Sequence, residues 1–299
     1  MTERNSAPER ILVTTHPFRE DVGELAESIA TTLRDKGIAV RIVPATIAAL
    51  SDPEVVEVAD RVSSGKADMV IALGGDGTVL RSASLSGEAG LPLLGINLGK
   101  VGFLAEAETG ELPTVLDRLL RGDYTLERRT ALAVRAVDSK GKHWAAWAFN
   151  EVAVEKAEPA RMLEVSVDID GTRVSRYGCD GVLCSTPTGS TAHAMSAGGP
   201  VVWPDVDALM LVPVNAHALF TTPMVMHPSA EVSITVESPM TPAALVADGK
   251  PVATLTCGSV VTITASDRPV YLVRMSERPY PQRLVSKLSL PVEGWRNQS

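Results

Sequence analysis

A single carboxylate lies among three glycines at the point where an apolar run ends. Residues 69–73 (MVIAL) are all apolar, and Gly-Gly-Asp-Gly-Thr follows at residues 74–78. Glycines let the backbone approach a ligand closely, and consecutive amides at a helix start can bind phosphate. A carboxylate repels phosphate, so the presence of Asp76 in a phosphate site indicates a separate chemical role. It could accept a proton from an attacking hydroxyl group, or hold a metal ion that bridges phosphates.

The same five residues could also form only a tight strand-to-helix turn, with Asp76 as the helix cap. The density of glycines directly after five apolar residues favours the phosphate site. The architecture is not that of a P-loop protein. In GINLGKV, residues 95–101, the two glycines are too close together for that motif, and Val101 stands where Ser or Thr is required.

A second group of small polar residues lies in YGCDGVLCSTPTGSTAHAMSAGGP, residues 177–200. Thr186 to Thr191 offer hydroxyl groups and amides ahead of a short helix predicted at residues 189–197. Hydroxyl groups at a helix start can simply cap it, but their density here favours a ligand site. In addition, Asn150 and Glu151 interrupt an apolar strand. A buried polar pair must be satisfied, so the two residues form either a structural network or a clamp for ligand hydroxyl groups.

The elements that position these residues differ between the two parts of the chain. Strands and helices alternate over the first 120 residues, which predicts a parallel sheet covered on both faces. Ligands of such sheets bind beyond the carboxyl ends of the strands, where residues 74–78 lie. We expect strands at 11–15, 38–43, 69–73 and 93–97, and helices at 21–36, 53–62, from about 78, and at 112–120.

After Tyr124 the pattern changes to short alternating segments. The stretches DIDGTRV and VADGKPV are typical of Asp-Gly hairpin turns between antiparallel strands. The fold class is therefore α/β followed by all-β. We predict an α/β domain at 1–124, an all-β domain at 125–275, and a tail, 276–299, that packs back on the first domain. Strands are expected at 131–137, 146–154, 163–169, 232–236, 260–264 and 270–274.

Composition excludes several classes of function. The chain has 299 residues and a net charge of -8 without a basic stripe, which argues against nucleic acid as a partner. The sequence has no signal-peptide pattern and no membrane-length apolar run, so a cytoplasmic location without a membrane partner is expected. The three cysteines lack CxxC spacing and the histidines lack metal spacing, so we predict no disulfide framework and no resident metal site.

Taken together, GGDGT, NLGKVGFLAE, NEVAVEK, CDGVLCSTPTGSTA and the closing GGP resemble the NAD kinases of the bacterial type. The resemblance runs from about residue 10 to LSLPVEGW near the C-terminus. It implies a Rossmann-like α/β domain, a β-sandwich-like NAD-binding domain, and a tail that rejoins the first domain. It also implies a phosphotransferase that acts on the adenosine ribose 2′-hydroxyl of NAD to give NADP, as a homodimer or homotetramer. The donor would be ATP or inorganic polyphosphate, with a divalent cation such as Mg²⁺.

The resemblance also implies roles for particular residues. Asp76 would be the catalytic base, glycine amides would touch phosphates, and Arg81 would add positive charge. Asn150 and Glu151 would grip hydroxyl groups or adenine, while Asp180 and residues 191–196 would bind the two ends of the dinucleotide. The complete set expected to bind substrate or nucleotide is Gly75, Gly77, Arg81, Asn150, Glu151, Arg161, Gly178, Asp180, Thr191, Ala192, His193, Ala194, Met195, Ser196 and Lys250.

Two features distinguish this chain within the resemblance. His193 stands where the family pattern has Tyr, so the planar ring is kept and the phenol is lost. Gly178 offers neither bulk nor charge beside Asp180, so we expect NADH to be accepted as well as NAD.

Two other functions fit parts of the sequence. Lipid kinases also carry GGDGT, but they require an apolar acceptor pocket and membrane affinity, and no basic or amphipathic segment here supports that. A non-catalytic dinucleotide sensor would be expected to lose Asp76, which is present.

Overall fold

The structure is a computed structural model that describes residues 6–16, 20–44, 67–98, 102–159, 161–275 and 279–292. The chain divides into two compact units, Met1–Arg128 with Val270–Ser299, and Arg129–Pro269. The helix predicted at 53–62 lies outside the described residues. Within the described parts, no helix combines the length and apolarity needed to cross a membrane.

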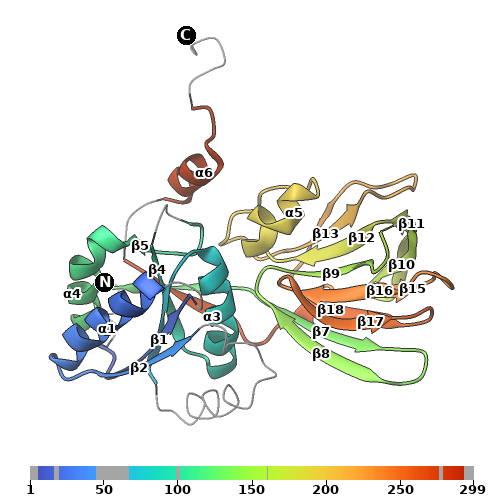
Figure 1. Cartoon of the computed structure of the whole chain (residues 1–299). Helices are drawn as coiled ribbons and strands as arrows, with labels where there is room; N and C mark the ends of the chain where they lie inside the picture. Colours follow the sequence, from blue (N-terminus) through green and yellow to red (C-terminus); the bar gives the residue numbers. More distant parts are fainter. Residues whose placement is uncertain are drawn as a thin grey trace. The chain divides into compact units, whose positions relative to one another are not determined.

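The first unit is built on a mainly parallel sheet with the strand order β2-β1-β3-β4-β19-β6, and β5 pairs with β4 (Figure 1). The β1–β2, β1–β3, β3–β4, β4–β5 and β4–β19 pairs are all parallel. The strands are β1 (Arg10–Thr15), β2 (Ala39–Pro44), β3 (Met69–Leu73), β4 (Pro92–Asn97), β5 (Ala107–Glu108), β6 (Thr125–Arg129) and β19 (Val270–Arg274).

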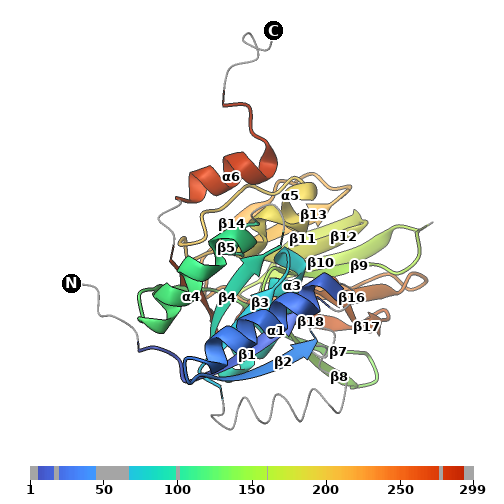
Figure 2. The same ribbon diagram turned by 60° about the vertical axis from the view of Figure 1, so that its left-hand side comes forward.

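Helices cover both faces of this sheet, as the alternation predicts. The helices α1 (Glu20–Arg34) and α4 (Leu112–Leu120) lie on one face, and α3 (Asp76–Ala89) lies on the other (Figure 1). Figure 2 shows α1 running along the sheet beside β1 and β2. The short helix η3 (Thr109–Glu111) leads into α4, and α6 (Tyr280–Leu288) is the last helix of the described chain.

Apolar spacing explains how these helices pack. Val22, Ala26 and Ile29 recur every three or four residues on α1 and join the buried core of the sheet. On the other face, α3 approaches β4 closely. A Cβ atom at Gly95 would lie 2.9 Å from Val79 Cγ2, so the contact requires glycine.

The strand predicted at 270–274 in the second domain lies in the first sheet instead, together with β6, which the sequence pattern did not predict. β6 and β19 join at the β4 side of that sheet, with Leu272 of β19 opposite Leu93. The boundaries therefore fall at 128/129 and 269/270 rather than at 124/125 and 275/276. The apolar pattern of residues 270–274 shows that the segment is buried, but not which of two sheets it joins.

The second unit is a β-sandwich of two antiparallel six-stranded sheets, ordered β11-β10-β15-β18-β7-β8 and β14-β13-β12-β9-β16-β17. Side chains from both sheets share one core, among them Val165, Ile234 and Leu245. The strands are β7 (Leu132–Val137), β8 (His143–Ala148), β9 (Glu151–Lys156), β10 (Leu163–Ile169), β11 (Thr172–Cys179), β12 (Gly181–Ser185), β13 (Leu209–Val214), β14 (Met224–Met226), β15 (Val232–Val236), β16 (Ala243–Ala247), β17 (Lys250–Leu255) and β18 (Val260–Ala265).

Both predicted Asp-Gly hairpins are confirmed. Asp170 and Gly171 have φ angles of 49° and 75°, and Asp248 and Gly249 have 48° and 73°. Two consecutive residues with positive φ form the tight turn whose twist matches antiparallel strands. The short helix predicted at 189–197 is present as η4 (Thr188–Thr191) and α5 (His193–Ser196).

Candidate functional site

The glycine-rich loop of the first unit connects the end of β3 directly to α3. Gly74 has a φ of 152°, and a Cβ atom there would lie 2.4 Å from Thr78 Oγ1. Gly75 is the N-cap of α3 and provides no side-chain cap. The first amides of a helix have no partners within the helix, so this N-terminus presents donors suited to phosphate. Gly75 and Gly77 are exposed there, as their predicted role requires.

Asp76 is the first residue of α3, two residues before the predicted helix start. Its carboxylate is held by backbone of a distant segment: Oδ1 accepts the Leu104 amide at 3.1 Å, and Oδ2 accepts the Phe103 amide at 3.2 Å. Lys287 Nζ forms an ion pair with Oδ2 at 3.3 Å. A Cβ atom at Gly102 would lie 1.9 Å from Asp76 Oδ1, so this close approach requires glycine at 102.

Arg81 lies on the same helix and is partly buried. Its Nε atom and the Oγ1 atom of Thr78 are both buried and have no hydrogen-bond partner. Buried polar atoms normally have partners, so these two mark a part of α3 that is suited to a polar ligand.

The residues of this loop fit a divalent cation that arrives with a nucleotide. The described parts of the chain hold no cluster of three or more His, Cys, Asp or Glu residues that could bind a metal alone. Mg²⁺ commonly uses one or two carboxylates together with substrate phosphates and water. One carboxylate, Asp76, beside helix N-terminal amides matches that chemistry.

In the second unit, Asp248 organises the start of β9. Its carboxylate accepts the amides of Phe149 at 2.7 Å, Asn150 at 2.8 Å and Glu151 at 3.2 Å. These bonds turn the backbone between β8 and β9, so the single strand predicted at 146–154 is wrong. The sequence pattern misses the break because Phe149 is apolar and keeps the alternation.

Glu151 and Asn150 each carry a buried oxygen that no group of the protein satisfies, Glu151 Oε2 and Asn150 Oδ1. Glu151 is 8% exposed. Burial, and then the charge of Asp248, raise the pKa of Glu151 to about 7, while the His193 backbone amide lowers it. Burial also raises the pKa of Asp248. A purely structural network would satisfy these oxygens, so the arrangement favours a clamp for ligand hydroxyl groups.

The Thr-Pro-Thr-Gly-Ser-Thr segment packs against the backbone of residues 149 and 150 and holds it in place. Thr186 Oγ1 donates to the Phe149 carbonyl oxygen at 2.7 Å and accepts the Gly189 amide at 3.1 Å. A Cβ atom at Gly189 would lie 2.2 Å from the Asn150 carbonyl oxygen. The hydroxyl groups that look like ligand donors in the sequence are thus partly engaged in holding the Asn150 backbone.

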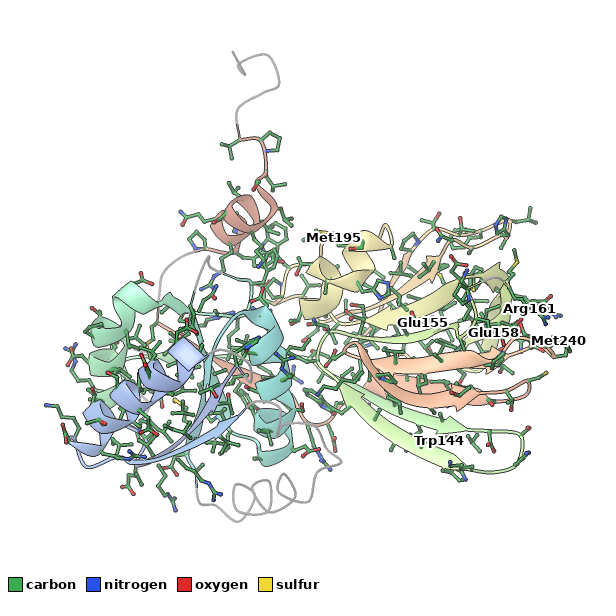
Figure 3. All side chains as sticks on the ribbon, viewed as in Figure 1. Trp144, Glu155, Glu158, Arg161, Met195 and Met240 are labelled. Carbon is green, nitrogen blue, oxygen red and sulfur yellow. The ribbon has the colours of Figure 1, made fainter. Side chains whose placement is uncertain are left out.

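Residues 191–196 contribute unequally to the surface. His193 and Ser196 are exposed, while Ala194 is fully buried among apolar side chains that include Leu183 and Val212. Met195 is partly exposed on α5 (Figure 3). Thr191 and Ala192 are also partly exposed. The side chain of Ala194 therefore packs α5 on the sheet, and only its backbone is available to a ligand.

Asp180 lies at the other end of β9. Lys156 Nζ lies 2.6 Å from Asp180 Oδ1, and Asn215 Nδ2 donates to Oδ2 at 2.9 Å. The hydrogen bond from Lys156, followed by the one from Asn215, lowers the pKa of Asp180. A Cβ atom at the neighbouring Gly178 would lie 2.5 Å from the Sδ atom of Met162, a flexible side chain. Sequence reasoning missed Lys156 and Asn215, although Lys156 ends the NEVAVEK motif.

Lys250 and Arg161, the two remaining predicted site residues, lie in different parts of the second unit. Lys250 begins β17 directly after the Asp248-Gly249 turn, and its charge lowers the pKa of Asp248. Arg161 is exposed beside Glu158 and Met240, well away from Met195 (Figure 3). The structure thus brings Lys250 to the Glu151 cluster and leaves Arg161 apart from it. Asn150, Glu151, Asp248 and Lys250 form one polar cluster, and Lys156, Asp180 and Asn215 form a second. Glu151 and Lys156 are five residues apart on one strand, so these two clusters are about 17 Å apart.

The raised pKa of Glu151 predicts how stability depends on pH. With a folded pKa of about 7 against an ordinary 4.5, the folded state binds more protons between these values. Stability is then highest below the ordinary pKa and falls as pH rises through the folded pKa. Glu151→Gln should remove this dependence, making the variant about 1–3 kcal/mol more stable than wild type at pH 8 and not at pH 4. Urea unfolding at both pH values measures it. Equal changes in the free energy of unfolding between pH 4 and pH 8 in wild type and Glu151→Gln would contradict it.

Comparisons with known proteins cover both units. Residues 11–124 match the model of the ATP-NAD kinase N-terminal domain, and residues 149–275 match that of the ATP-NAD kinase C-terminal domain. The chain is 44% identical to an NAD kinase of Thermobifida fusca, over 97% of this chain and 92% of that protein. It is 41% identical to an NAD kinase of Mycobacterium leprae over the full length of both.

Two solved structures share the fold. The crystal structure of yeast NADH kinase complexed with NADH has a TM-score of 0.82 and 22% identity, and covers 98% of this chain and 94% of that one. The crystal structure of an NAD kinase from Archaeoglobus fulgidus in complex with ATP has a TM-score of 0.70 and 26% identity, and covers 94% and 98%.

Proposed function

Because the chain belongs to the ATP-NAD kinase family, we propose that it transfers a phosphoryl group from ATP to the adenosine ribose 2′-hydroxyl of NAD, which gives NADP and ADP. The observation that carries this proposal is Asp76. Its carboxylate is fixed at the N-terminus of α3, among exposed glycine amides.

In this proposal, the oxygen of the 2′-hydroxyl group bonds to the terminal phosphorus of ATP, and Asp76 accepts the proton of that hydroxyl group. The bond from that phosphorus to the bridging oxygen breaks, and ADP leaves with the electron pair. Amides of the α3 N-terminus stabilise the charge on the transferred group, and Arg81 adds positive charge. A divalent cation, which the phosphates would hold while Asp76 acts as the base, would neutralise part of the phosphate charge.

The second unit supplies the groups that hold the dinucleotide. Asn150 Oδ1 and Glu151 Oε2 are buried acceptors suited to ribose hydroxyl groups or the adenine amino group. Asp180 lies at the far end of β9. Two polar clusters about 17 Å apart along one strand fit an elongated ligand better than a compact one.

The pairing of Asp180 supports NADH as a second acceptor. NADH lacks the positive charge of the nicotinamide ring of NAD. Because Lys156 already compensates the Asp180 charge, this carboxylate gives little preference for the charged ring. Inorganic polyphosphate remains a proposed alternative donor, because glycine amides recognise phosphate rather than adenine. The exposed side chains of Leu219, Phe220 and Val225 support a homodimer or homotetramer.

One assay tests the function. The protein is incubated with NAD, ATP and Mg²⁺, and NADP is measured with an NADP-specific dehydrogenase. Parallel reactions replace ATP by polyphosphate, or Mg²⁺ by a chelator, and a reaction with NADH in place of NAD is assayed for NADPH. Absence of NADP and NADPH in every reaction, with phosphorylation of a diacylglycerol in vesicles, would identify a lipid kinase instead.

His193 provides a further prediction. It is exposed on α5, and its backbone amide bonds Glu151. If its ring stacks on the dinucleotide, His193→Ala should raise KM for NAD about 2- to 12-fold, the equivalent of about 0.5–1.5 kcal/mol of stacking, with little change in kcat. His193→Tyr should keep KM near wild type because the ring is kept. Steady-state kinetics decide this, and a His193→Tyr enzyme with a higher KM than His193→Ala would refute stacking.

A further inference from the structure

The C-terminal helix reaches the catalytic carboxylate. Lys287 lies near the end of α6, more than two hundred residues after Asp76 in the sequence, and its Nζ atom lies 3.3 Å from Asp76 Oδ2. The two side chains are 39% and 28% exposed, so neither is fully solvated. No other ionised side chain contacts Asp76 among the described residues.

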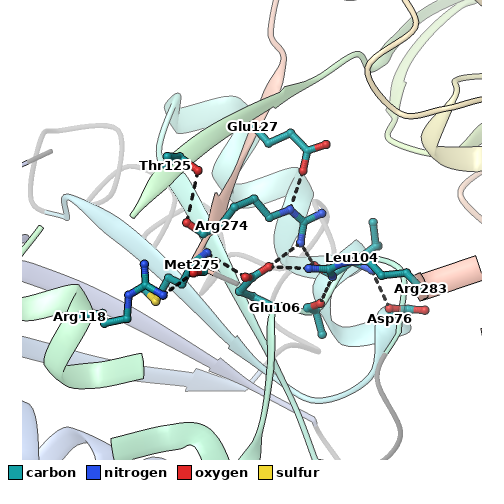
Figure 4. A network of polar contacts seen from close by, with 10 residues as sticks. Asp76, Leu104, Glu106, Arg118, Thr125, Glu127, Arg274, Met275 and Arg283 are labelled. Atoms are coloured by element: carbon teal, nitrogen blue, oxygen red, sulfur yellow. Dashed lines mark hydrogen bonds and ion pairs between the residues drawn. The ribbon is translucent and has the colours of Figure 1, made fainter. Parts of the chain in front are cut away.

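A buried ion network fixes α6 in this place. Glu106 is 2% exposed, and its Oε2 atom accepts Arg283 Nη2 at 2.9 Å and Arg274 Nη1 at 3.1 Å. Arg283 Nη1 also donates to the Ala105 carbonyl oxygen at 2.7 Å. Figure 4 shows this network and Asp76 close together. The helix is thus tied by Arg283 to the segment that includes Glu106.

That same segment supplies the two amides that bind Asp76. Phe103 and Leu104 precede Glu106 by only a few residues, and the Phe103 ring lies against Tyr280 of α6, with centroids 6.2 Å apart. Helix α6 therefore acts on Asp76 in two ways. It contacts the carboxylate through Lys287, and it braces the backbone that holds the carboxylate.

The contacts on the two carboxylate oxygens are unequal. Among the described residues, Oδ2 receives both the Phe103 amide and Lys287, whereas Oδ1 receives only the Leu104 amide. An ionised carboxylate oxygen has about two lone-pair sites. Oδ2 is therefore filled, and Oδ1 keeps capacity for one more donor.

We propose that Lys287 is a positioning residue of the phosphoryl transfer. It holds Asp76 Oδ2 and thereby leaves Oδ1 oriented toward the acceptor hydroxyl group. This inference rests on the proposed function, because it assigns Asp76 the role of proton acceptor. Lys287 itself need not touch either substrate.

The kinetic test uses the full-length protein and compares three variants. Lys287→Met should lower kcat by up to about 100-fold, as small misplacements of a reacting group do, with KM for NAD and the melting temperature unchanged. Lys287→Arg should restore most of kcat, because it returns a cation to the same place. Lys36→Met, which removes an exposed lysine after α1, is the charge control and should behave as wild type.

A second measurement does not depend on activity. Hydrogen exchange of the Phe103 and Leu104 amides, in the protein without substrates, should be faster in Lys287→Met than in wild type and in Lys36→Met. Unchanged kcat, unchanged exchange, or a kcat loss that Lys287→Arg does not restore overturns the inference. If wild type forms no NADP, the proposed function fails, while the exchange measurement still tests whether Lys287 holds Asp76.

Discussion

Asp76→Asn is expected to lower kcat by about 10²–10⁴-fold, the usual contribution of a general base, while Kd for NAD stays near wild type. Asn is close to Asp in size but cannot accept the proton of the attacking hydroxyl group. The groups proposed to bind NAD belong to the second unit, so they are unchanged. Single-turnover rates measure the loss, and calorimetric titration with NAD measures the binding.

Asp76→Asn can also disturb the structure around residue 76, and this effect must be distinguished from loss of the base. Asp76 accepts a backbone amide at each oxygen, whereas Asn can accept at only one and presents an NH₂ group at the other. Part of any loss could then come from displacement of residues 103–104. Melting temperatures should accompany the kinetics, with Asp117→Asn, an exposed carboxylate on α4, as the control. Near-normal turnover by Asp76→Asn would remove Asp76 from the mechanism.

Local patterns were sufficient for the parts of the site that depend on neighbours in sequence. The apolar run before Gly74 predicts a buried strand, and the glycines predict a close turn into a helix at its carboxyl end. The Asp248-Gly249 turn is likewise a local signal. Each of these depends on residues within one or two turns of chain, where propensity and spacing hold the information.

Long-range contacts left no such signal. Lys287 is one of several charged residues in the C-terminal tail, and nothing in its sequence neighbours points to Asp76. Glu106 follows an apolar stretch, and only the fold shows that it is buried between two arginines. Residues 270–274 form a short, mainly apolar segment that would fit either sheet, so pairing with β4 could not be foreseen.

Burial helps to distinguish the two roles considered for Asn150 and Glu151, a structural network and a ligand clamp. The sequence shows a polar pair inside an apolar strand, which fits a structural network and a ligand clamp equally. Their unsatisfied side-chain oxygens favour the clamp, and the three amides bound by Asp248 explain how the backbone there is held. A role that depends on which atoms remain without partners can only be read from coordinates.

Glu106→Ala is expected to destabilise the first unit by about 3–5 kcal/mol, the usual cost of removing one member of a buried ion pair. Arg274 keeps Glu127 as a partner, and Arg283 keeps the Ala105 carbonyl oxygen but loses the Glu106 carboxylate. Burial already lowers the pKa of Arg283, so its charged guanidinium group depends on the carboxylate that Glu106 provides. Glu106→Gln keeps two hydrogen-bonding atoms and should lose less. Glu24→Ala, on the exposed face of α1, should lose almost nothing.

The two units offer separate probes of this loss. Among the described residues, the long helices belong to the first unit, and Trp144, Trp147 and Trp203 belong to the second. In a Trp295→Phe background, guanidinium unfolding followed by helical circular dichroism therefore reports mainly the first unit, and tryptophan fluorescence reports the second. Glu106→Ala should move the circular dichroism transition to lower denaturant and move the fluorescence transition less. Removing a buried partner of Arg283 must lower stability if the network holds α6 in place. Equal stability of Glu106→Ala and Glu24→Ala would therefore show that it does not.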